Sequence, residues 1–338
     1  MQIKVGTDFS GIGSPEMALK LLGIDHKQVF ACEIDKYARK SFEAIHSKPN
    51  IFYEDITKRN HSEVPQLDLY VAGFPCQAFS MAGKRKGFDD VRGTLFFNVA
   101  DFIRINQPKC FILENVKGLL SHENGNTFQT IKSLLSDNGG TVNSQMYIPY
   151  FLDGLGYHIY YKVLNTKEYG IPQNRERIFI VGFKEFREFS FPKPFPLELR
   201  LKDMLQDNPD NKYYLSKNAL KSFEINEKIK VPSGSNKGYE EAEDGDCINL
   251  GHPNSKTQRG RVSKKLSHTI DTTNSQAVVC NFKIRKLTPL ECFRLQGFPD
   301  EAFFRAEKVN SDTQLYKQAG NSITVNVMME LLKKIFNI

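Results

Sequence analysis

Short apolar runs alternate with amphipathic segments through the first 120 residues of the chain. The runs lie at 3–9, 28–33, 51–53, 67–71 and 110–113, and their lengths are typical of buried strands. Between them, apolar side chains recur at helical spacing, as in the segment that follows Thr94. Repeated strand and helix units of this kind fold into a doubly wound, mostly parallel α/β sheet with right-handed crossovers. We predict that class, with a second, smaller domain where the alternation fades after residue 185.

Length and composition narrow the choice of protein class. The 338 residues can bury one large core or two smaller ones. No apolar run approaches the length that crosses a membrane, and the six cysteines show neither CxxC pairs nor zinc-site spacing. We therefore expect a cytoplasmic protein with no membrane partner and no metal. The net charge of +7 is compatible with a polyanionic partner without requiring one.

One cysteine stands where a predicted strand gives way to a loop. Cys76 follows the apolar run 67–71 and therefore falls at a carboxyl strand end, where open α/β sheets bind ligands. Pro75 fixes a backbone dihedral directly before it, and the basic tract 83–87 can close over an anionic substrate and lower the pKa of the thiol. The alternatives are a plain buried thiol and an ordinary solvated run of charge.

Glycines and acids at other strand ends suggest a nucleoside cofactor. Gly11 and Gly13 follow the first strand and permit close approach of a ligand to the backbone, while Glu33 ends the second strand and can accept hydrogen bonds from ribose hydroxyls. Asp55 supplies a second acid after the third strand. The third glycine of the dinucleotide fingerprint is replaced by Glu16, so a plain tight turn is the alternative.

A carboxylate and two guanidiniums complete the candidate chemistry. Glu114 ends the strand beside the one that leads to Cys76, so the two side chains can face one pocket. Alternation places Gln173, Arg175 and Arg177 on one face of an extended segment, where they can meet an anion or carbonyl oxygens. Capping of the next segment by Glu114, and surface salt bridges of the arginines, are the alternatives.

These motifs, in this order, resemble the DNA (cytosine-5) methyltransferases of bacterial restriction-modification systems. The resemblance runs nearly end to end and is carried by GFPCQAFS at 73–80 and by the segments 9–13, 92–97, 114–116, 173–177, 285–289, 297–299 and 320–322. It implies the Rossmann-like fold of S-adenosylmethionine-dependent methyltransferases with a smaller target-recognition domain. Several separate motifs in one order are far more specific than any one of them alone.

The resemblance implies a covalent mechanism on a flipped-out base of double-stranded DNA. The thiolate of Cys76 adds to C6 of cytosine, Glu114 hydrogen-bonds the ring N3 and the exocyclic amine, and Arg175 and Arg177 bind the base oxygen and a nearby phosphate. S-adenosylmethionine is the implied methyl donor. The residues at its contact positions are Phe9, Gly11, Ile12, Gly13, Glu33, Asp55, Ile56, Pro75, Leu95, Asn321 and Ser322.

The chain departs from the family pattern at Ile34, where some relatives carry an aromatic side chain that stacks on adenine, and in its first motif. The family usually has an acid two places before the phenylalanine of its first motif, whereas this chain has Thr7 there and its acid at Asp8. A shift of one residue along a strand turns a side chain to the opposite face, so the role of Asp8 is open.

The family pattern also implies a division of labour along the chain. The catalytic domain is expected at 1–185, completed by 318–338, with target recognition at 186–317 and a monomer as the working form. The implied DNA contacts are Ser80, Lys84, Arg85, Lys86, Gln173, Gln258 and Arg261. A basic surface loop is the alternative for the segment 258–262, and the stretch 138–149 resembles an insertion without an assigned function.

Three other functions fit parts of the sequence. A methyltransferase acting on cytosine in tRNA would use the same base chemistry. A DNA-binding regulator could keep the fold without catalysis, although the chain retains Cys76, Glu114, Arg175 and Arg177. A nicotinamide dehydrogenase fits worst, because the glycine fingerprint is broken.

Overall fold

The computed structural model describes residues 2–46, 48–75, 95–136, 154–225, 228–251, 257–281 and 283–338. The chain divides into two compact units: the first holds Met1–Leu164, Glu176–Pro192 and Met328–Ile338, and the second holds Asn165–Arg175 and Lys193–Val327. These bounds differ from the domain limits expected from the sequence, because 186–192 belong to the first unit and 165–175 and 318–327 to the second.

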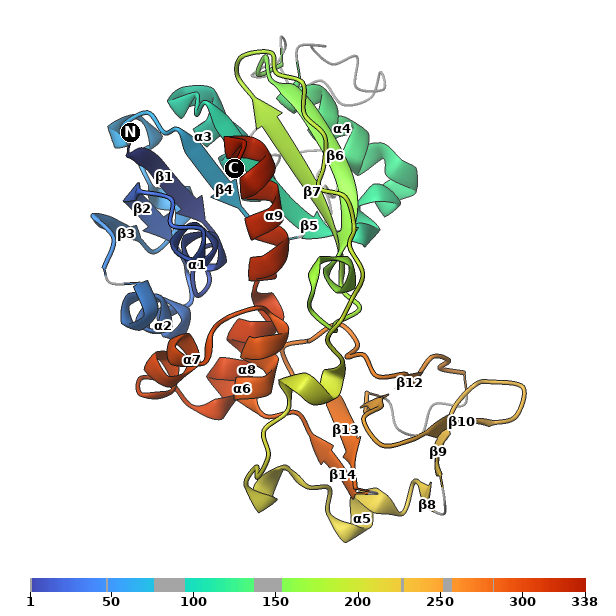
Figure 1. Ribbon diagram of the computed structural model, residues 1–338. Helices are drawn as coiled ribbons and strands as arrows, with labels where there is room; N and C mark the ends of the chain where they lie inside the picture. Colours follow the sequence, from blue (N-terminus) through green and yellow to red (C-terminus); the bar gives the residue numbers. More distant parts are fainter. Residues whose placement is uncertain are drawn as a thin grey trace, which may run out of the picture. The chain divides into compact units, whose positions relative to one another are not determined.

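A seven-stranded sheet organises the first unit, with the order β3-β2-β1-β4-β5-β7-β6 (Figure 1). Its strands are β1 (Ile3–Asp8), β2 (His26–Cys32), β3 (Ile51–Tyr53), β4 (Leu69–Ala72), β5 (Cys110–Val116), β6 (His158–Asn165) and β7 (Glu176–Phe183). The first five pair in parallel, whereas β7 runs antiparallel to β5. The predicted α/β class is confirmed, and the sheet is mixed.

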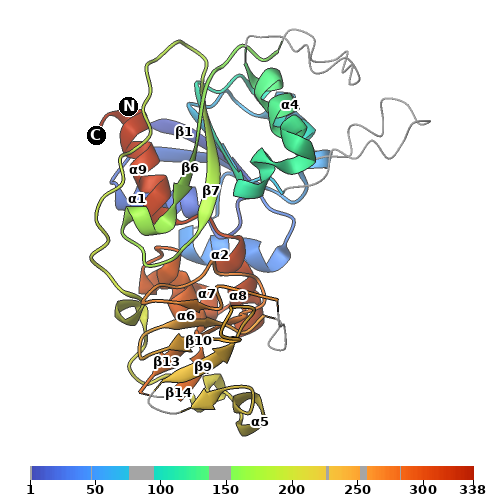
Figure 2. The same ribbon diagram turned by 90° about the vertical axis from the view of Figure 1, so that its right-hand side faces the viewer.

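Helices cover both faces of this sheet. They are α1 (Ser14–Leu21), α2 (Lys36–His46), α3 (Leu95–Asn106), α4 (Asn126–Leu135) and α9 (Val325–Phe336). Figure 2 shows α1 and α9 on one side of the sheet and α4 on the other. Apolar side chains of α3 and α4 form one buried cluster with those of β4 and β5, as their helical spacing requires.

The second unit is built from short antiparallel strands and short helices. A three-stranded sheet has the order β10-β9-β8 and a four-stranded sheet the order β12-β11-β13-β14. Their bounds are β8 (Glu224–Ile225), β9 (Ile229–Pro232), β10 (Tyr239–Ala242), β11 (Cys247–Asn249), β12 (Val262–Ser263), β13 (Gln276–Cys280) and β14 (Lys283–Lys286). The helices are α5 (Lys217–Leu220), α6 (Pro289–Leu295), α7 (Asp300–Glu307) and α8 (Asp312–Asn321). Thr288 and Glu291 form a capping box that fixes the start of α6.

Asp8, whose role the sequence left open, forms a fully buried ion pair with Arg59 in the core of the first unit. The two carboxylate oxygens of Asp8 accept from Nη1 and Nη2 of Arg59 at 2.7 and 2.8 Å, and the Tyr70 hydroxyl donates to the same carboxylate at 2.6 Å. The guanidinium also stacks 4.4 Å from the ring centroid of Phe30. Asp8 is therefore committed to the core.

Within the described ranges, no helix combines the length and the apolar character needed to cross a bilayer.

We predict that the substitution Asp8→Asn lowers the free energy of unfolding by about 3–5 kcal/mol, because it leaves the buried Arg59 charge without its partner. Urea unfolding followed by circular dichroism measures the loss. As a control, Asp101→Asn removes the partner of Arg104 in a half-exposed pair on α3 and should cost at most about 1 kcal/mol. Equal losses in the two variants would contradict the structural role of Asp8.

Candidate active site

The end of β5 and the start of β7 place a carboxylate against a guanidinium. In the antiparallel register Val116 pairs with Arg177 and Glu114 pairs with Phe179, so Glu114 and Arg177 are diagonal neighbours on one face of the sheet. Nε of Arg177 lies 3.1 Å from Oε1 of Glu114. Their side chains are 17% and 11% exposed, so the pair is partly desolvated and still reaches the surface.

The electrostatics of this pair suit a small polar ring. Burial lowers the pKa of Arg177 and the Glu114 carboxylate opposes that shift, but an arginine stays charged throughout the physiological range. The pair thus presents a carboxyl group and a guanidinium side by side. A ring with an amine, a ring nitrogen and a carbonyl oxygen on neighbouring atoms can match both groups.

The strand that leads to the candidate nucleophile lies beside β5. In the parallel pairing of β4 with β5, Ala72 lies opposite Leu113. Phe74 follows, buried against Phe96 with ring centroids 5.3 Å apart, and Pro75 is exposed. The predicted nucleophile Cys76 and the predicted DNA contacts Ser80, Lys84, Arg85 and Lys86 lie outside the described residues, as does the stretch 138–149.

Gln173 and Arg175 belong to the second unit and Arg177 to the first. The amide of Arg175 donates to the carbonyl oxygen of Gln173, so the backbone turns at 173–175 instead of forming the predicted extended segment. The Arg175 guanidinium is buried and donates to the carbonyl oxygens of Ile270, Gly320 and Ser322 at 3.1, 3.0 and 2.8 Å. The sequence analysis expected either an anion or carbonyl oxygens as partners of the arginines. For Arg175 the described partners are carbonyl oxygens.

Gln173 is equally enclosed. Its side chain is buried, donates to the carbonyl oxygen of Leu295 at 2.7 Å and accepts from the amide of Ile270 at 2.9 Å. The contacts of Gln173 and Arg175 support the backbone of the second unit, and none of the described contacts supports the expectation that the two side chains meet DNA.

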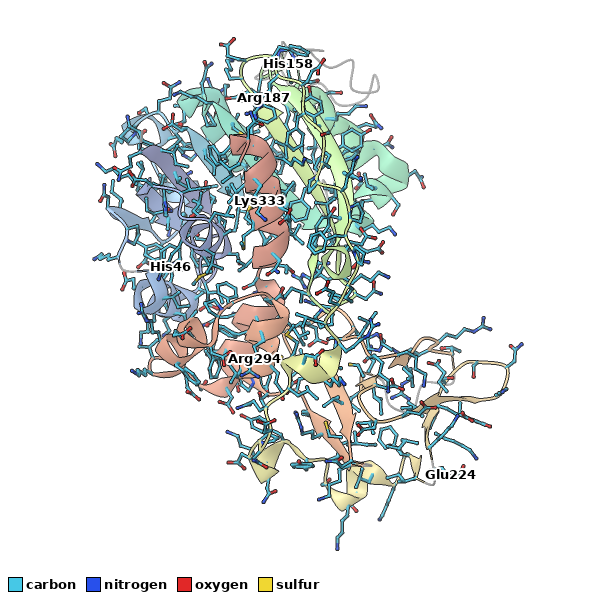
Figure 3. The ribbon with its side chains drawn as sticks, in the orientation of Figure 1. His46, His158, Arg187, Glu224, Arg294 and Lys333 are labelled. Carbon is cyan, nitrogen blue, oxygen red and sulfur yellow. The ribbon has the colours of Figure 1, made fainter. Side chains whose placement is uncertain are left out.

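The loop after β1 is shaped by left-handed residues. Phe9, Gly11 and Gly13 have φ angles of 53°, 54° and 82°. A Cβ atom at Gly13 would lie 2.4 Å from the ring of His46, whereas one at Gly11 would meet nothing within 4 Å. His46 ends α2 (Figure 3) and its Nε2 lies 3.0 Å from the carbonyl oxygen of Ile12. The positive φ of Phe9 is backbone strain held at the strand end, as at many ligand sites.

Glu33 is hydrogen-bonded to the backbone of Gly11. Its carboxylate accepts from the amides of Gly11 and Asp35 at 2.9 and 2.8 Å, and burial raises its pKa although these two hydrogen bonds oppose the shift. Each oxygen keeps a second lone pair for a ligand hydroxyl. The next residue, Ile34, is 74% exposed and offers an apolar surface at the same strand end.

The remaining predicted cofactor positions are spread over both units. Asp55 caps a short 3₁₀ helix, and the Thr57 hydroxyl that bonds its carboxylate lowers the pKa of Asp55. The other residues are Ile12 and Ile56, which are buried, Leu95, which is half-buried at the start of α3, and Pro75, which is exposed. Exposed Asn321 and buried Ser322 belong to the second unit, and their part in the site stays a prediction.

Glu16 is a residue that the sequence reasoning treated only as a broken glycine motif. Its Oε1 accepts from the Thr7 hydroxyl and from the Gln28 amide, both at 2.8 Å, directly behind the loop after β1. Its Oε2 has no hydrogen-bond donor among the described residues. Burial raises the pKa of Glu16 from 4.5 to about 7.

In the second unit, Arg261 is buried and faces inward. Its guanidinium donates to the carbonyl oxygens of Pro232 and Asn249, at 2.6 Å from Nη1 and 3.0 Å from Nη2. These contacts hold the ends of β9 and β11 together and give no support to the predicted DNA contact. Gln258 is half-buried, and its carbonyl oxygen accepts from the amide of Gly234. Arg259, between the two, is exposed.

Comparisons with known proteins agree on one family. The sequence matches the family model described as C-5 cytosine-specific DNA methylase over residues 5–148 and 145–337. It is 38% identical to type II methyltransferase M.HpaII of Haemophilus parainfluenzae, covering 97% of this chain and 87% of the relative. It is 36% identical to type II methyltransferase M.SsoII of Shigella sonnei, covering 97% and 79%.

The fold has solved counterparts. The S. pombe Dnmt2 methyltransferase superposes with a TM-score of 0.65 at 19% identity, covering 99% of both chains. At that identity the likeness bears on the fold alone, and it agrees with the Rossmann-like methyltransferase arrangement of the sheet.

Glu16 makes stability depend on pH. Its native pKa of about 7 lies above the ordinary 4.5, so the native state holds a proton that the unfolded state releases. Stability should fall as pH rises from about 4.5 to 7 and stay level above that range. We predict that the free energy of unfolding of Glu16→Gln, which cannot ionise at this position, is higher than that of the parent chain by roughly 3 kcal/mol at pH 8. At pH 4.5 the two free energies should differ little.

Urea unfolding at several pH values measures this difference. Glu43→Gln, an exposed substitution on α2, is the control and should keep the pH profile of the parent chain. A Glu16→Gln profile parallel to that of the parent would contradict a buried, protonated Glu16.

Proposed function

Since the chain belongs to the C-5 cytosine-specific DNA methylases, we propose that it transfers a methyl group from S-adenosylmethionine to C5 of a cytosine flipped out of a specific double-stranded DNA sequence. The observation that carries this proposal is the Glu114–Arg177 pair at the end of β5, beside the strand that leads to Cys76. The family description, C-5 cytosine-specific DNA methylase, favours DNA over tRNA as substrate.

Carbon C5 of cytosine is a weak nucleophile, and the first step makes it stronger. The Cys76 thiolate adds to C6, which forms an S–C6 bond and moves the electron pair of the C5–C6 double bond onto C5. Glu114 donates toward the ring N3 and accepts from the exocyclic amine, so it neutralises charge that develops as the sulfur adds. Arg177 donates to the base oxygen.

The later steps restore the ring and the enzyme. C5 takes the methyl group, so that a C5–C bond forms as the sulfonium–methyl bond breaks. Loss of the C5 proton to water then returns its electron pair to the C5–C6 bond while the S–C6 bond breaks, and Cys76 leaves as a thiolate. The duplex hides C6, so the base must first leave the stack at a cost of a few kcal/mol.

The loop after β1 fits the adenosine part of the methyl donor. Gly11 leaves open space where a side chain would stand, and Glu33 beside it has lone pairs for ribose hydroxyls. Ile34 offers an apolar surface to the adenine ring, and Asp55 an acceptor for its amine. When bound, S-adenosylmethionine supplies a methyl group activated by a sulfonium.

The second unit is the candidate for DNA recognition, in keeping with the expected recognition segment 186–317. Arg259 and Arg261 are the arginines of the loop proposed to contact DNA. Arg259 is exposed, with its Nε donating to the carbonyl oxygen of Gly234, whereas the buried Arg261 guanidinium donates to the carbonyl oxygens of Pro232 and Asn249. One chain carries both catalytic and recognition segments, which supports action as a monomer. The relatives from Shigella and Haemophilus are bacterial, and bacterial DNA lies in the cytoplasm, so we propose that location for this chain.

Trapping on a fluorinated base tests the covalent mechanism. With duplex DNA that carries 5-fluorocytosine at the target and with S-adenosylmethionine, the fluorine blocks the final proton loss, so a covalent complex should accumulate and map to the peptide of Cys76. Cys76→Ser should abolish it. Methyl transfer to tRNA alone would overturn the substrate, and an adduct on another cysteine would overturn the mechanism.

The carboxyl group of Glu114 gives a second prediction. Glu114→Gln keeps the shape of the side chain and should lower kcat by about 10²–10³-fold, because an amide cannot transfer a proton toward N3 as the carboxyl group does. Glu176→Gln is the matched control. Glu176 starts β7 and pairs with Lys117 at the surface, so its substitution should change kcat by less than about twofold. Radiolabelled methyl transfer to the target duplex measures both.

A further inference from the structure

Asn115 lies between Glu114 and Val116 on β5 and has no role in the mechanism so far. Successive side chains of a strand point to opposite faces, so Asn115 faces away from the Glu114–Arg177 pair. It is 3% exposed. Its Nδ2 donates to the carbonyl oxygen of Phe74 at 2.9 Å, and its Oδ1 accepts from the amide of Val116 at 2.8 Å. Both ends of the side-chain amide are therefore in use.

The bond to Phe74 extends the sheet where its backbone ladder must stop. Ala72 lies opposite Leu113, and continuing that register places Phe74 opposite Asn115. The residue after Phe74 is Pro75, which has no N–H to give to a ladder. A buried carbonyl oxygen without a donor is costly, and the Asn115 amide supplies one to Phe74.

The segment directly before Cys76 is thus fixed at three points. The Phe74 carbonyl is held by Asn115, the Phe74 ring packs against Phe96, and Pro75 has its own φ fixed by its ring. Asn115 is also the chain neighbour of Glu114, so one strand anchors both the start of the Cys76 segment and the carboxyl group of the candidate site.

We propose that Asn115 is a positioning residue for the nucleophile: its hydrogen bond to Phe74 fixes the start of the Cys76 segment relative to Glu114, so that the sulfur meets C6 of the base that Glu114 binds. This inference rests on the proposed function. It predicts a defect in the rate of bond formation with little change in DNA affinity, since the Asn115 side chain is buried and both ends of its amide bond backbone groups of the protein.

Two substitutions at Asn115 test the proposal. Asn115→Asp keeps the size and the acceptor for Val116 but replaces the donor to Phe74 by an oxygen, and Asn115→Ala removes both bonds. The single-turnover rate of covalent trapping on 5-fluorocytosine duplex should fall about 10–100-fold in each variant, the range expected when a reacting group is misplaced by about 1 Å. The Kd for the same duplex, measured on a Cys76→Ser background, should change by less than about threefold.

Asn106→Asp is the matched control. Asn106 is 6% exposed in the same unit, and its Nδ2 donates to the carbonyl oxygens of Val64 and Pro65, both at 3.0 Å. It ends α3, and its Oδ1 accepts from the amide of Leu67, ahead of the start of β4. Its loss should lower the melting temperature as a buried hydrogen bond does, while the trapping rate per folded molecule stays within about twofold of the parent chain.

The outcomes separate the two proposals. The trapping rates are measured below the melting temperature of each variant and normalised to the fraction of protein that is trapped. If Asn115→Asp does not fold, the rate of Asn115→Ala tests the positioning role. Slow trapping at unchanged Kd in the Asn115 variants supports positioning. The positioning role is overturned if the Asn115 variants trap DNA as fast as Asn106→Asp does, or if they change only the Kd for the duplex. If the parent chain itself traps no DNA, the proposed function fails instead.

Discussion

The pairing of β5 with its two neighbours is the constraint on which the candidate site depends. Parallel pairing with β4 brings the start of the Cys76 segment to the end of β5, and antiparallel pairing with β7 brings Arg177 to the same end from the other side. An all-parallel sheet would place the start of β7 at the opposite edge, away from Glu114. The reversal of one strand therefore assembles a carboxyl group and a guanidinium that lie 63 positions apart in the sequence.

The core tolerates a buried charge pair because its charges are almost fully compensated. Both side chains of the Asp8–Arg59 pair are 0% exposed, and the carboxylate receives two guanidinium bonds and one from Tyr70. The guanidinium faces aromatic rings, which attract its charge. Such a pair contributes little net stability compared with apolar packing but penalises any arrangement that separates its members. It therefore ties the end of β1 to the segment that follows β3.

Much of the fold could be predicted from the sequence, because the periodicity of apolar residues reports burial directly. The strands β1, β2, β3, β4 and β5 and the helix α3 fall close to the predicted segments. The antiparallel direction of β7 could not be predicted, since an apolar run carries no direction. Glu114 and Arg177 do meet, but Gln173, Arg175 and Arg261 bind backbone carbonyls inside the second unit. Irregular backbone leaves carbonyl oxygens without partners in a helix or sheet, so polar side chains must supply the donors. The sequence of a polar or basic motif does not reveal whether its side chains bind these carbonyl oxygens or DNA.

At position 7, where the family pattern stated above has an acid, this chain has a threonine whose hydroxyl supports the loop after β1. An acid at position 7 would point toward the Glu16 side of β1, where the structure has the Thr7 hydroxyl donating to Glu16. The Glu16 carboxyl group lies on the helix α1 behind the loop, while Asp8, next to Thr7, turns to the core and pairs with Arg59. Because Glu16 also accepts from Gln28 on β2, its carboxyl group joins β1, α1 and β2 at the base of the loop. Gly11 and Gly13 then need only supply the turn, and the support behind them comes from buried hydrogen bonds rather than from the strand itself.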